Sequence, residues 1–118
     1  MLMIYSDPER PWTGSEDDRA ELRELFALRE RLAATGELIA SDALTEPAQA
    51  RTVRVRGGSV AVTDGPFAEV KEHLAGYFLV DCASLDRALE IAALTPVARR
   101  SAMEVRPILD EAVMRREL

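Results

Sequence analysis

The fold of this chain is decided by residues 76–108, GYFLVDCASLDRALEIAALTPVARRSAMEVRPI. The stretch begins with an apolar run at residues 76–82 that is typical of a strand. Ser84 then caps a predicted helix, whose apolar residues recur at helical spacing until Pro96 ends it. In residues 102–108 apolar and charged residues alternate, which indicates a second strand. The stretch therefore predicts a strand–helix–strand unit.

The first part of the chain repeats this order. Residues 1–5 are a short apolar strand, followed by a break that contains two prolines and a glycine. Ser15 and Asp18 form a capping box, and leucines at helical spacing predict a helix over residues 16–34 that stops at Gly36. A weaker strand follows in residues 37–45, ELIASDALT.

Between the two units lies a hairpin signal, TVRVRGGSVAVT, at residues 52–63. A two-residue turn at Gly57-Gly58 pairs Arg56 with Ser59, Val55 with Val60, and Val53 with Val62. The four valines then lie on one face of the hairpin, and the arginines at 54 and 56 lie on the other. Register and hydrophobic pattern agree, as a hairpin requires.

The predicted order is strand, helix, strand, inserted hairpin, strand, helix, strand. Without the hairpin this is the split βαβ repeat of ferredoxin-like α+β folds, and we expect one domain over residues 1–118. Both helices then cover one face of an antiparallel sheet and leave the other bare. Such a face must be hydrated or covered by a partner, so we expect a homodimer with a half-enclosed cleft between two sheets.

Charge and composition exclude several classes of protein. The formal net charge of -6 argues against nucleic acid as a partner, because phosphate binding needs clustered Lys and Arg. The single cysteine excludes an internal disulfide and a cysteine-based zinc site, and we expect neither a metal nor a cofactor. No basic leader is present and no segment approaches about 18 apolar residues, so we expect no membrane association and a cytoplasmic location.

Three segments carry a family resemblance: VTDGPFAEVKEHLAGYFLVD, SLDRALEIAALTP and MEVRPI. Together they resemble the DGPF group of the YCII-related family, and the resemblance covers nearly the whole chain. It implies a dimeric α+β barrel in which two ferredoxin-like sheets pack face to face. Some members of the family carry a His–Asp pair proposed as catalytic, with the histidine on or near the second strand. Residues 37–45 contain no histidine, so His73 cannot be assigned that role by position.

Asp64 and His73 are the candidate catalytic residues. Asp64 begins Asp-Gly-Pro-Phe, where it acts either as a general base or ligand group at the mouth of the cleft, or as a turn cap that accepts a backbone N–H. His73 is suited to moving protons at neutral pH, although a lone histidine in a polar stretch is more often exposed. If residues 67–74 form helical turns, Glu69 and His73 share a face.

Five further side chains are candidate ligand-binding residues. Glu69 and Lys71 follow the Asp-Gly-Pro-Phe turn and either converge on a polar ligand or stay solvated. Tyr5, Tyr77 and Arg106 are assigned to the cleft by strand parity, with pairing to the partner subunit as the alternative for Arg106.

Three functions are compatible with these residues. The favoured one is a small-molecule site in the cleft between the sheets, with acid–base turnover of the lyase or isomerase type as its catalytic form. Many proteins that this chain resembles are encoded beside extracytoplasmic-function sigma factors, so a non-catalytic accessory or regulatory module is the alternative. The third is a structural dimer with a vestigial cleft. The sequence names no substrate.

Overall fold

The computed structural model of the chain describes residues 1–67 and 72–118. A four-stranded sheet is built in the order β2-β5-β1-β6 from β1 (Leu2–Ser6), β2 (Leu38–Ala43), β5 (His73–Val80) and β6 (Met103–Val105). Every neighbouring pair of these strands is antiparallel. The helices are α1 (Glu16–Ala34), α2 (Leu85–Ala93), α3 (Val97–Arg100) and α4 (Glu111–Arg116), with a 3-10 turn, η1, at Pro47–Gln49. This confirms the predicted ferredoxin-like α+β arrangement.

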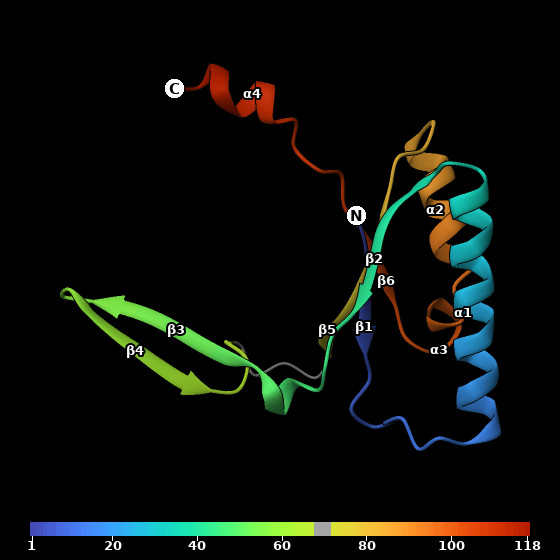
Figure 1. Ribbon diagram of the computed structural model, residues 1–118, viewed down its shortest axis with the longest axis horizontal. Helices are drawn as coiled ribbons and strands as arrows, with labels where there is room; N and C mark the ends of the chain where they lie inside the picture. The colour runs from blue at the N-terminus through green and yellow to red at the C-terminus, as the bar shows by residue number, and fades with distance from the viewer. Residues whose placement is uncertain (68–71) are drawn as a thin grey trace.

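The helices α1 and α2 pack on the same face of the sheet, and the core lies between them and the strands (Figure 1). Leu2 and Phe78 are cross-strand partners in β1 and β5, and both are buried. The helices contribute buried Leu28, Leu32 and Ile91 to the same cluster. Burying these side chains is the main favourable term in folding.

The helix at residues 16–34 was predicted with the bounds that the structure shows. Its cap is also confirmed, because the Asp18 backbone N–H donates to Ser15 Oγ at 3.1 Å. Two local predictions were incomplete. The strand predicted from Gly76 begins at His73, because β1 continues to Ser6 and pairs with it. His73 and Leu74 are therefore extended, and residues 68–71 of the helical turns considered for residues 67–74 lie outside the described residues. A short helix, α3, also forms directly after Pro96.

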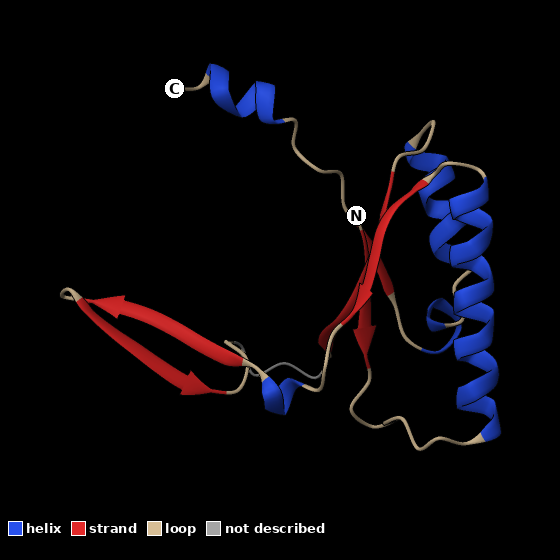
Figure 2. Ribbon diagram, in the orientation of Figure 1, coloured by secondary structure: helices blue, strands red, loops and turns tan. Residues whose placement is uncertain are grey.

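The inserted hairpin, β3 (Arg51–Arg56) and β4 (Ser59–Asp64), has the predicted register. Both turn residues have positive φ, +56° at Gly57 and +81° at Gly58, which suits a type I′ turn and favours glycine. The hairpin and α4 project from the rest of the chain on the side away from α1 and α2 (Figures 1 and 2). They raise the radius of gyration to 17.0 Å, against about 13.5 Å for a compact chain of this length.

Candidate functional site

The sheet has a second face that, among the described residues, no helix covers (Figure 2). We call it the open face. Successive side chains of a strand point to opposite faces of the sheet, so Met3 and Tyr77, which are chain neighbours of the buried Leu2 and Phe78, lie on the open face. The register places one residue from each strand in a single row on the open face, in the order Asp42, Tyr77, Met3, Glu104.

Two tyrosine–carboxylate hydrogen bonds organise the open face. The Tyr77 hydroxyl on β5 donates to Asp42 Oδ2 on β2 at 2.7 Å. The Tyr5 hydroxyl on β1 donates to Glu104 Oε2 on β6 at 2.8 Å. Each tyrosine therefore stands on an inner strand and each carboxylate on the neighbouring edge strand. Hydrogen bonds to an ionised acceptor are shorter and stronger than neutral ones, so each pair is held in one geometry.

Both tyrosines are held in the protonated form. The hydrogen bond to Glu104, helped by burial and by the charge of Glu104, raises the pKa of Tyr5 above its usual 10.0, and the nearby Arg106 guanidinium partly opposes this. The hydrogen bond to Asp42 likewise raises the pKa of Tyr77, with burial and the charge of Asp42 adding to it. At neutral pH the open face therefore presents phenol groups beside carboxylates.

A spectroscopic titration checks this arrangement directly, because the chain has only two tyrosines. We expect both phenolate absorbance transitions above the usual pKa of 10.0. Since folding raises the pKa of both tyrosines, the two pairs stabilise the fold fully below the usual tyrosine pKa of 10.0. This stabilisation is lost as the pH rises through the raised pKa values. Asp42→Asn should move one transition down, while Asp86→Asn on α2 should move neither. Two transitions at the ordinary value would contradict the pairing.

The backbone of Arg106, the residue directly after β6, forms hydrogen bonds with Met1, the residue directly before β1. Its N–H donates to the Met1 carbonyl oxygen at 2.8 Å, and the N-terminal ammonium of Met1 donates to its carbonyl oxygen at 2.6 Å. By strand alternation from the core residue Val105, its side chain lies on the open face beside Glu104's row. Tyr5, Tyr77 and Arg106, assigned to the cleft by parity, therefore share one surface.

The candidate catalytic residues lie elsewhere. Asp64 ends β4 at the base of the hairpin, where its carboxylate contacts Arg51 Nε at 3.2 Å with 90% of the side chain exposed. Among the described residues, Asp64 makes an ion pair with a side chain, and the turn cap stays a prediction. His73 opens β5 opposite Ser6, whose hydroxyl donates to its carbonyl oxygen at 3.3 Å. Glu69 and Lys71 lie outside the described residues.

The site residues predicted from the sequence include neither Asp42 nor Glu104. The strand that carries Asp42 has a register shift between Leu38 and Ala40, so simple alternation counted from its start fails. The signal in the sequence was a carboxylate within a predicted strand, for which no partner could be assigned.

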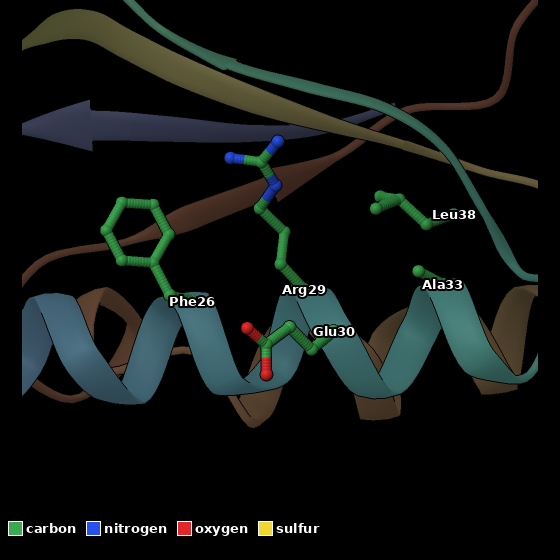
Figure 3. Close-up of a pocket in the computed structure, with 5 residues that line it drawn as sticks. All are labelled: Phe26, Arg29, Glu30, Ala33 and Leu38. Atoms are coloured by element: carbon green, nitrogen blue, oxygen red, sulfur yellow. The ribbon is translucent and has the colours of Figure 1, made fainter.

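A separate groove of about 420 Å³ lies on the helical side, lined by Phe26, Arg29, Glu30, Ala33 and Leu38. The Arg29 guanidinium carbon is 6.0 Å from the Phe26 ring centre. Figure 3 shows the charged ends of Arg29 and Glu30 pointing in different directions, so the groove offers no convergent set of polar groups. The open face is the better candidate site.

Within residues 1–67 and 72–118, no cluster of three or more His, Cys, Asp and Glu side chains is arranged to hold a metal ion. Over the same residues, no helix has both the length and the apolar character that crossing a bilayer requires.

Comparison with known proteins identifies related chains. The family model described as the YCII-related domain matches residues 1–112. An uncharacterised protein of Rhizobium meliloti (strain 1021), R00369, is 41% identical over 111 residues, which cover 91% of this chain and 89% of the relative.

Proposed function

The chain belongs to the YCII-related family, and from that premise we propose that it is a homodimer that binds a polar small molecule between the open faces of its two sheets. The observation that carries this proposal is the pair of tyrosine–carboxylate hydrogen bonds, Tyr77–Asp42 and Tyr5–Glu104, on the open face. Ordered polar groups on an otherwise partly apolar surface are what a ligand site needs for orientation.

The composition of the open face supports a sheet-to-sheet dimer. Apolar Met3, Leu74 and Leu79 share this face with the polar row, and Leu74 remains 42% exposed. A face of mixed character is suited to a partner that covers its apolar part while leaving room over its polar part. Two packed sheets lie about 10 Å apart, a distance that side chains and a small ligand can share.

The hydrogen-bonding groups of the open face indicate which class of ligand it would bind. Each tyrosine donates to one carboxylate oxygen, and the other oxygen of Asp42 and of Glu104 accepts no hydrogen bond from the described residues. These oxygens accept hydrogen bonds, so the proposed ligand carries N–H or O–H donors, as an amine or a polyol does. Arg106 supplies the balancing cation beside Glu104.

If the ligand is turned over, acid–base chemistry of the lyase or isomerase type suits these groups. A tyrosine kept protonated beside a carboxylate is able to donate a proton, and the carboxylate is able to receive one. Asp64 and His73 stay proposed acid–base groups, and Glu69 and Lys71 stay proposed ligand contacts. The Asp-Gly-Pro-Phe sequence at residues 64–67 supports placement in the DGPF group.

The test combines oligomeric state with binding. Light scattering should show a dimer at micromolar concentration, and calorimetry with a panel of small amines, polyols and carboxylic acids should find binders among the donors. Asp42→Asn with Glu104→Gln should weaken that binding about tenfold to a hundredfold, the value of charge-assisted hydrogen bonds. Asp86→Asn, which removes a carboxylate on α2, is the control and should bind normally.

The possible outcomes separate the hypotheses. A monomer whose open face is hydrated contradicts the homodimer. A dimer that binds none of the panel contradicts the ligand site and favours the accessory module tied to a sigma factor. Binding that survives the double substitution unchanged places the ligand away from the tyrosine–carboxylate pairs.

A further inference from the structure

The β3–β4 hairpin carries an apolar face that the described chain leaves in water. Four valines lie on this face as two cross-strand pairs, with exposures of 62% for Val53, 56% for Val55, 67% for Val60 and 60% for Val62. A two-stranded hairpin without a further packed layer is marginally stable in water. A contiguous exposed patch of this kind usually marks an interaction surface.

The chain's own residues pack on the opposite face of the hairpin. Thr52 Oγ1 donates to the Gly65 carbonyl oxygen at 2.8 Å, and the Arg54 guanidinium carbon lies 5.2 Å from the ring centre of Phe67. Thr52 and Arg54 alternate with the valines along β3, so these contacts are on the arginine face. Gly65 and Phe67, which follow the hairpin, therefore pack on the arginine face, and within residues 1–67 and 72–118 nothing covers the valine face.

The hairpin projects on the side of the sheet that bears the open face (Figure 1). A second copy that packs against the open face is therefore within reach of the hairpin. Six residues in each hairpin strand extend over about 20 Å, twice the separation of two packed sheets. A hairpin of this length extends beyond the partner's sheet, so that its valine face would lie against the end of the partner subunit.

The areas support the same arrangement. A four-stranded face about five residues long measures about 300 Å² from ordinary strand dimensions, whereas a stable interface buries about 800 Å² on each partner. The valine face adds about 200 Å², and by two-fold symmetry each subunit also receives the other's hairpin, which adds a similar area. The area of the sheet face alone is smaller than the area that a stable interface buries on each partner. The sheet face together with the two hairpins comes close to that area.

We propose that the β3–β4 hairpin is a dimer arm whose four-valine face packs on a second copy of the chain. This inference rests on the homodimer of the proposed function and names the surface that holds it together. The arginines at 54 and 56 face away from the contact, where their charges remain hydrated.

Charge substitutions on the two faces of one strand test the arm. Val60→Asp with Val62→Asp puts carboxylates on the valine face, and Ala61→Asp puts one on the opposite face of the same strand. We expect the double variant to raise the dimer Kd at least about thirtyfold, as the loss of an interface hot spot does, and Ala61→Asp to leave it within a few-fold. Sedimentation velocity over a concentration series measures both.

Hydrogen exchange provides a second, independent measurement. In the wild-type protein, the amides of residues 51–64 should exchange slowly when the dimer is populated. They should exchange rapidly when dilution produces monomer, because a hairpin without a packing partner is only marginally stable. The core strand β5 should stay protected in both states. In the Val60→Asp, Val62→Asp variant the hairpin should exchange rapidly at all concentrations while circular dichroism reports a folded core.

The two proposals fail in distinguishable ways. A wild-type monomer at high concentration overturns the homodimer and the arm together. A wild-type dimer whose Kd is unchanged by Val60→Asp with Val62→Asp overturns the arm and leaves the sheet-to-sheet dimer standing. Hairpin protection that does not depend on concentration shows the arm folded onto its own chain, which also overturns the proposal.

Discussion

Phe78→Ala is expected to lower the free energy of unfolding by about 3–5 kcal/mol, the range for removing a buried aromatic side chain. Phe78 on β5 is 1% exposed and lies in a cluster with Leu2 and Ile91. The substitution removes contacts with both the sheet and the helical layer and leaves a cavity that the strands on either side of β5 cannot close. Such a loss is a large part of the stability of a domain of this size.

Urea denaturation monitored by circular dichroism measures this loss, at one protein concentration so that any dimer contribution is held constant. Phe26→Ala is the matched control, because Phe26 on α1 is 48% exposed and already in contact with water. We expect it to cost about 1 kcal/mol. Equal losses at the two positions would show that β5 and the helices do not enclose a common core.

Gly76→Ala is expected to destabilise the protein by about 1–3 kcal/mol through overpacking. A Cβ atom at Gly76 would lie 2.8 Å from the Asp42 carbonyl oxygen and 3.3 Å from the Ala43 Cα. Both neighbours are backbone atoms of β2, so no side chain can rotate away to make room. The two strands must separate locally, at the point where β2 is the edge of the sheet.

The same substitution should change the candidate site. Moving β2 away from β5 lengthens the hydrogen bond between the Tyr77 hydroxyl and Asp42, now 2.7 Å, and the pKa of Tyr77 should fall toward its usual value. Gly65→Ala is the control, because its φ of +88° strains a side chain although the surrounding space is open. It should lower stability by about 1–2 kcal/mol and leave the tyrosine titration unchanged.

Much of the fold could be predicted because its signals are local. The α1 bounds follow from the Ser15 cap and the helical spacing of its leucines, and the hairpin register follows from Gly57-Gly58 and its valines. Each signal involves residues that are close in the chain, so short-range geometry is sufficient to read it. The start of β5 at His73 could not be read this way, since it depends on pairing with Ser6.

The candidate site was only partly predictable for the same reason. Strand alternation assigned Tyr5, Tyr77 and Arg106 to one face, because side-chain parity is a property of a single strand. Asp42 could not be assigned in this way, because the register shift between Leu38 and Ala40 changes which face of the sheet the later residues of β2 occupy. The exposure of Asp64 at the base of the hairpin could not be read from its turn motif, which is compatible with several environments.

By itself the sequence determined the elements, their order and the ferredoxin-like class, since capping, periodicity and turn chemistry act between near neighbours. Only the tertiary structure decided which side chains meet. Tyr77 and Asp42 are 35 residues apart, and Tyr5 and Glu104 are 99 apart. Their contacts depend on the strand order β2-β5-β1-β6 and on register, which are set by burying one face of the whole sheet against two helices.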